Sequence, residues 1–161
     1  MDVNSSSALP GVTGIVCLLD DDLSMLKALD RLLLSAGLKA QLFSKPLDFL
    51  SYVIGNSVAL AVIDIWMAGM SGLEVQTKLQ AVSPNTRVII STADDHDSAR
   101  SAAIQAGAIA FFVKPFDEEV FLVAVRQALA WRANVMLSSP ARVASTITPW
   151  SNSIRPTFSI S

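Results

Sequence analysis

Carboxylate side chains directly follow two apolar runs of this sequence. Asp20 and Asp21 come after residues 15–19, and Asp64 comes after residues 58–63. A charge at the mouth of a buried strand is costly unless water, a cation or a partner reaches it. Carboxylates that converge in one crevice repel each other, and oxygen ligands with room for water suit Mg²⁺. We therefore expect these three acids to hold Mg²⁺ if the fold brings them together.

Two other polar side chains occupy equivalent places later in the chain. Thr92 follows the apolar run in "RVIIS", and Lys114 ends the run "AFFVK". Taken alone, each such residue is more often a helix cap or a turn residue, by about three to one. Taken together, an acidic trio, a hydroxyl and a lysine are suited to moving a phosphoryl group onto a carboxylate. Asp64 would attack while the metal and Lys114 neutralise the phosphoryl oxygens.

The elements that must position these groups alternate between strand and helix. Ser44 is the expected N-cap of the second helix, with Pro46 in its first turn. The expected strands cover residues 15–19, 39–43, 60–63, 87–91 and 110–113, and the helices begin near residues 23, 46, 72, 98 and 117.

This alternation predicts a parallel sheet with right-handed crossovers. At this chain length we expect an α/β, flavodoxin-like (βα)5 doubly wound fold with strand order 2-1-3-4-5. In that order the first and third strands are neighbours at the point where the order reverses. Asp20, Asp21 and Asp64 then meet at one crevice.

Composition excludes several classes of function. Apolar residues make up 52% of the 161 residues, but charges interrupt every apolar run well before the roughly 18–20 residues of a spanning helix, so we expect no membrane insertion. The net charge is −2, and the sequence contains no block of Lys and Arg residues. We therefore expect no direct nucleic-acid binding by this chain. The single cysteine, Cys17, lies in an apolar run and is interpreted as a core residue in a reducing, cytoplasmic compartment.

We expect one folded domain with a segment on each side of it. Residues 1–14 are polar and turn-prone and predict a flexible N-terminal arm, and residues 15–132 hold the alternating pattern. Residues 133–161 contain Ser, Thr and Pro without periodicity and predict a disordered tail.

Four motifs together resemble a known family. The stretches "VCLLDDD", "VIDIWMAGMSG", "VIISTADD" and "AFFVKPF" occur in the order and spacing of the receiver domain of bacterial two-component response regulators. The resemblance covers about residues 15–132. Details such as "MSG" and "AGAIAFFVKPF" look most like the FixJ-type branch.

The resemblance implies a role for each acid. Asp64 would be the phosphoacceptor for the phosphohistidine of a sensor histidine kinase. Asp20 and Asp21 would bind Mg²⁺ with Asp64, and the backbone carbonyl of Trp66 would be a further ligand. Ala68 stands where the family usually has proline, which makes the loop after Asp64 less rigid.

The resemblance also implies a switch. Lys114 would pair with the phosphoryl group, through a Lys114–Pro115 peptide expected to be cis. Thr92 would move to bond a phosphoryl oxygen, and Phe111 would turn inward with it. The face formed by residues 98–106, 110–113 and 117–131 would then change and bind a partner or a second copy of the chain.

Two interpretations of function remain open from the sequence, and two others, a phosphatase and a flavodoxin, fit poorly. The first is a receiver that acts alone through protein partners. The second is a receiver fragment of a transcriptional regulator whose C-terminal DNA-binding output domain is missing. A phosphatase would want an acid two residues after the nucleophile, where Trp66 stands, and a flavodoxin would want a Ser/Thr/Gly-rich loop where "DDD" stands. A receiver phosphorylates itself and hydrolyses the product slowly, so we expect a phosphoacceptor and no enzyme.

Overall fold

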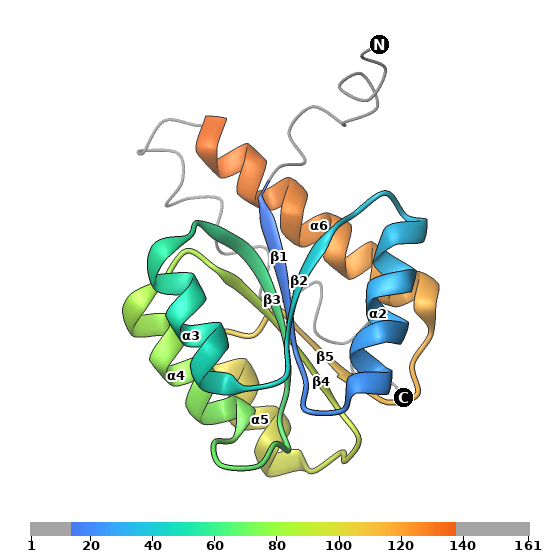
Figure 1. Ribbon diagram of the computed structural model, residues 1–161, viewed down its shortest axis with the longest axis vertical. Helices are drawn as coiled ribbons and strands as arrows, with labels where there is room; N and C mark the ends of the chain where they lie inside the picture. Colours follow the sequence, from blue (N-terminus) through green and yellow to red (C-terminus); the bar gives the residue numbers. More distant parts are fainter. Residues whose placement is uncertain (1–13, 138–161) are drawn as a thin grey trace.

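The computed structural model describes residues 14–137 of the chain. In this part, five strands and five helices alternate, with helices numbered from α2 as in Figure 1. The elements are β1 (Ile15–Leu19), α2 (Leu23–Ser35), β2 (Ala40–Phe43), α3 (Pro46–Gly55), β3 (Val58–Asp64), α4 (Gly72–Val82), β4 (Arg87–Thr92), α5 (Asp97–Gln105), β5 (Ala110–Val113) and α6 (Glu118–Leu137).

The strands form one parallel sheet in the order β2-β1-β3-β4-β5. This order confirms the predicted flavodoxin-like topology. The order reverses between β1 and β3, which carry Asp20 and Asp64 at their carboxyl ends.

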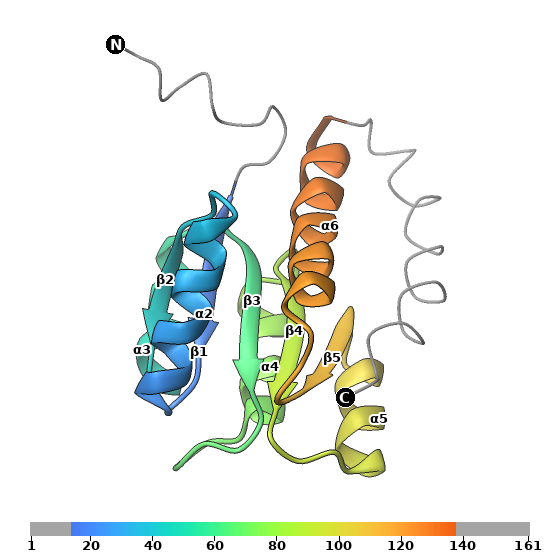
Figure 2. The ribbon, with the colours of Figure 1, turned by 90° about the vertical axis from the view of Figure 1, so that its right-hand side faces the viewer.

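Helices cover both faces of the sheet. Helices α2 and α6 lie on one side and α3, α4 and α5 on the other (Figure 1, Figure 2). Each side has its own apolar core, and all seven residues of β3 are buried between them. Because a doubly covered strand is apolar on both faces, its sequence is a continuous apolar run without alternation. The high apolar content is therefore explained by the two cores.

Two helices near the carboxyl edge begin with side-chain caps. The Asp22 carboxylate accepts hydrogen bonds from the backbone N–H groups of Ser24 and Met25 at the start of α2. Ser71 and Glu74 form a capping box at the start of α4. These caps satisfy backbone donors that a helix leaves unpaired and hold both helix starts beside the acidic residues.

Several expected boundaries differ from the structure, mostly by one or two residues, and two of the differences have a physical reason. The prediction of Ser44 as an N-cap is wrong, because Lys45 is the N-cap of α3 and no side-chain hydrogen bond caps it. Pro46 at the first helical position starts this helix instead, since its fixed φ already suits a helix. Helix α6 continues to Leu137, beyond the expected end at residue 131, through a segment without Gly or Pro.

Other expectations fall outside the described part of the chain. The predicted arm lies there except for Gly14, and the predicted tail lies there from residue 138 onward. Within residues 14–137, no helix combines the length and apolar character needed to cross a bilayer.

Candidate functional site

Four strands each carry a polar residue at the carboxyl edge of the sheet. Each polar residue lies two positions beyond a residue of the core under α2 and α6. Because side chains alternate along a strand, these polar residues share that face. The core residues are Leu18, Val62, Ile89 and Phe112, and the polar residues that follow them are Asp20, Asp64, Ser91 and Lys114.

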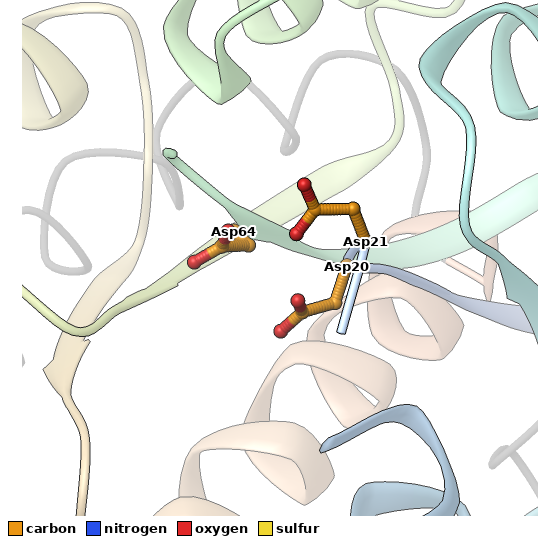
Figure 3. A group of neighbouring side chains, drawn as sticks. All are labelled: Asp20, Asp21 and Asp64. Carbon is orange, nitrogen blue, oxygen red and sulfur yellow. The ribbon is translucent and has the colours of Figure 1, made fainter. Parts of the chain in front are cut away.

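The three predicted acids converge at this edge. One carboxylate oxygen from each of Asp20, Asp21 and Asp64 lies within 4.8 Å of the others (Figure 3). Asp20 and Asp64 are buried, whereas Asp21 is exposed. Backbone donors orient two of them, since Asp20 accepts from the N–H of Asp22 at 2.9 Å and Asp21 from that of Ala68 at 3.3 Å. The site therefore combines a buried floor with an opening to solvent at Asp21.

Lys114 bridges the two buried acids. Its Nζ donates to Asp20 Oδ2 at 2.7 Å and to Asp64 Oδ1 at 3.3 Å. The backbone N–H of Lys114 donates to the carbonyl of Thr92 at 2.7 Å, which carries the pairing of β5 with β4 past the end of the strand. The Lys114–Pro115 peptide is cis, as predicted. One ammonium group is thus shared between carboxylates that come from β1 and β3.

The surroundings of Asp64 raise its pKa from 3.8 to about 6. Burial is the largest cause, and the negative charges of Asp20 and Asp21 act in the same direction. Lys114 opposes both through its charge and its hydrogen bond. At neutral pH Asp64 is still mostly ionised, in a site where carboxylate groups outnumber the one ammonium group.

Thr92 and Phe111 lie on the opposite face of the sheet from Asp64, because it is their neighbours Ser91 and Phe112 that are in register with Asp64. The buried Thr92 ends β4, and its Oγ1 accepts a hydrogen bond from the N–H of Asp94 at 3.3 Å. Phe111 is also buried, with the Arg100 guanidinium 4.7 Å from its ring centroid. Phe111 is therefore already in the inward position that we expected it to take on activation.

Trp66 connects two loops at the rim of the site. Its side chain is half exposed, and its ring meets that of His96 edge to face with centroids 6.1 Å apart. Trp66 follows β3, and His96 is the N-cap of α5. This contact links the loop after Asp64 with the loop after Thr92.

Gly72 has a role that sequence reasoning missed. A Cβ on this residue would clash with the backbone oxygen of Asp64. Its N–H donates to the carbonyl of Ile65 at 2.8 Å. Only a residue without a side chain lets α4 begin this close to the phosphoacceptor candidate. Its place at the start of a helix, eight residues after Asp64, does not distinguish it in the sequence from an ordinary turn glycine.

Comparison with known proteins identifies a family over most of the described chain. The model of the "Response regulator receiver domain" family matches residues 16–126. Response regulator protein TodT of Pseudomonas putida is 37% identical over 115 residues, which cover 71% of this chain and 51% of TodT. Response regulator protein TmoT of Ectopseudomonas mendocina is 38% identical over 115 residues, covering 71% of this chain and 52% of TmoT. The chain spans about half the length of these curated relatives.

Solved structures share the fold. A CheY-like receiver domain protein from Methanospirillum hungatei superposes with a TM-score of 0.71 at 21% identity, over 75% of this chain and 97% of that one. The beryllofluoride-activated receiver domain of DrrB superposes with a TM-score of 0.66 at 26% identity, over 73% and 97% of the two chains. With the converging acids, the bridging lysine and the family match over residues 16–126, this chain belongs to the response regulator receiver domains of two-component systems.

Proposed function

We propose that this protein is a phosphorylation-dependent signalling switch whose phosphoacceptor is Asp64. A carboxylate oxygen of Asp64 attacks the phosphorus of a phosphohistidine on a sensor histidine kinase. The P–N bond breaks as the new O–P bond forms, and the kinase imidazole takes up a proton. The product is an acyl phosphate, and its slow hydrolysis by water restores Asp64, so the chain acts as a phosphoacceptor and not as an enzyme.

The observation that carries this proposal is the placement of Lys114 against Asp64. Its ammonium lies 3.3 Å from Asp64 Oδ1, at the edge of the sheet where Asp21 opens the site to solvent. A phosphoryl group on Asp64 brings close to two negative charges. The ammonium of Lys114 already lies next to the carboxylate that would carry those oxygens. Lys114 therefore needs little rearrangement to neutralise their charge.

The residues present fit a divalent cation. Three carboxylates converge here, but the one ammonium is paired only with Asp20 and Asp64. Their oxygens lie close enough together for one ion to touch all three. Asp20, Asp21, Asp64 and the backbone carbonyl of Trp66 would hold Mg²⁺. When bound, Mg²⁺ would supply positive charge that offsets the carboxylates and the phosphoryl oxygens.

We infer that the signal leaves through α5, β5 and α6. Strand β5 is an edge of the sheet, and α5 and α6 lie on its two sides (Figure 2). Thr92 would turn toward the phosphoryl group and shift the following loop, and Asp95 of that loop is ion-paired to Arg100 on α5. Because Arg100 also lies over Phe111, this movement would reach the β5 side without an inward turn of the ring. The changed face would bind a partner or a second copy of the chain.

Phosphotransfer with the intact protein tests the proposal. The chain is incubated with acetyl phosphate and Mg²⁺, and its intact mass is recorded. The parent should gain the mass of one phosphoryl group, and Asp64→Asn should gain none. Asp22→Asn is the matched control, because asparagine caps a helix as well as aspartate does and Asp22 is the exposed acid next to the site. Uptake by Asp64→Asn at the parent rate would refute the proposal.

The output of the switch has a second candidate. TodT and TmoT are about twice as long as the matched region. A relative in Escherichia coli, 33% identical over 117 residues that cover 25% of its length, carries the name DNA-binding transcriptional regulator NtrC. We keep the alternative that this chain is the receiver part of a regulator with a DNA-binding output. Placement in the FixJ-type branch rests on "MSG" and "AGAIAFFVKPF", and placement in the cytoplasm rests on the family. The coding sequence downstream of Ser161 would distinguish a lone receiver from a longer regulator.

A further inference from the structure

Ser91 is a buried hydroxyl without a partner among the described residues. Its side chain is 2% exposed, and its Oγ makes no hydrogen bond. A buried polar group left in this state costs stability, and such groups are rare in folded proteins. The hydroxyl therefore calls for a physical explanation.

The register of the sheet places Ser91 beside the phosphoacceptor. Ser91 pairs with Asp64 on β3 and with Phe112 on β5. Neighbours in register on parallel strands point their side chains to the same face of the sheet. Lys114 follows Phe112 by two positions, so its stem rises on that face as well. The Ser91 hydroxyl thus lies between the strands that supply Asp64 and Lys114.

The ammonium of Lys114 has a donor to spare. It carries three N–H donors, and two of them have the acceptors Asp20 Oδ2 and Asp64 Oδ1. Phosphorylation converts the Asp64 carboxylate into an acyl phosphate, which weakens that second contact. The Lys114 ammonium must then contact the phosphoryl oxygens while it remains close to the carboxyl end of β4.

We propose that Ser91 is a positioning residue for Lys114, its hydroxyl oxygen accepting an ammonium N–H of Lys114 when a phosphoryl group is on Asp64. This inference rests on the proposed function of Asp64. The bond is made only in the phosphorylated state, which explains why the hydroxyl has no partner in the structure described here. Ser91 does not touch the phosphoryl group, in contrast to the role expected of Thr92.

Ser91→Thr and Ser91→Val form a matched pair for testing it. The two replacements have nearly the same shape and suit a strand equally, but only threonine keeps the hydroxyl. We expect Ser91→Thr to take up phosphate from acetyl phosphate near the parent rate. We expect Ser91→Val to be about tenfold slower, because one hydrogen bond to a charged donor is lost. Equal rates for the two variants would overturn the inference.

A second measurement separates positioning from packing. With beryllofluoride as the phosphoryl mimic and ¹⁵N-labelled lysine, the ammonium protons of Lys114 are assigned by their loss in Lys114→Met. Their exchange with water should be slow in the parent and in Ser91→Thr, and about tenfold faster in Ser91→Val. Unchanged exchange in Ser91→Val would refute the bond even if phosphorylation slowed.

Two controls keep the result interpretable. Thermal melting shows whether Ser91→Val folds, and if it does not, Ser91→Ala takes its place, because alanine fits wherever serine does. A parent that takes up no phosphoryl group would overturn the proposed function and this inference together. A phosphorylated parent with indistinguishable variants would reject only the role of Ser91.

Discussion

Replacing Asp64 with asparagine should stabilise the fold at neutral pH when divalent cations are removed. In the parent, burial and the neighbouring acids hold the pKa of Asp64 at about 6, above its ordinary 3.8. The folded state therefore binds a proton on this carboxyl more tightly than the unfolded chain does. This contribution to stability is complete below pH 3.8 and is lost as the pH rises through about 6. Asparagine has no charge to bury, so the stability of Asp64→Asn lacks this dependence on pH.

The size of the effect follows from the two pKa values. A tenfold change in an acid constant corresponds to about 1.4 kcal/mol, so the rise from 3.8 to about 6 sets an upper value of roughly 3 kcal/mol. Water that enters the site beside the exposed Asp21 screens part of this cost. We expect Asp64→Asn to exceed the parent by about 1–2 kcal/mol at pH 7.5, with the difference falling toward zero near pH 4.

Urea unfolding in EDTA between pH 4 and 8 measures this difference directly. Asp22→Asn is the control, because it removes a neighbouring carboxylate that is exposed and lies outside the converging three acids. Adding Mg²⁺ should then stabilise the parent and narrow its gap to Asp64→Asn, since a ligand that binds the folded state shifts the equilibrium toward it. A difference between Asp64→Asn and the parent that stays constant from pH 4 to 8 would refute the electrostatic account of Asp64.

Two other predictions follow from single positions. Gly72→Ala should lower the free energy of unfolding by about 1–3 kcal/mol and slow phosphorylation, because its Cβ displaces the backbone of Asp64. Gly55→Ala is the control, because nothing lies within 4 Å of its new Cβ, and it should be neutral or slightly stabilising. Parent-like stability and phosphorylation in Gly72→Ala would contradict the predicted clash. Burial raises the pKa of the Cys17 thiol to about 12, so iodoacetamide at pH 8 should label it only in denaturant. Labelling of the native protein at the rate of a free thiol would show that the β1 core opens readily.

Much of the architecture was predictable because its signals are local. A strand buried on both faces is a continuous apolar run, as β3 is up to its last residue, Asp64, and such a run can be recognised from its own residues. The alternation of strands with helices restricts the connections to right-handed crossovers and leaves few topologies. Helix starts were harder to predict. Ser44 resembles a cap, but Pro46 decides where α3 begins, and only the backbone geometry shows which of the two signals is used.

What the sequence alone determined was which charged groups stand at the strand ends and the edge of the sheet on which they meet. Asp20, Asp21, Asp64 and Lys114 stand at strand ends, and the carboxyl ends of parallel strands lie together in any sheet of this order. The tertiary structure decided which atoms touch, and with them the raised pKa of Asp64. Asp20 and Lys114 are 94 positions apart, and no local pattern predicts a 2.7 Å contact over that separation. Such distances depend on how helices on both faces press the strands together, so the close approach at Gly72 became visible only in the packed fold.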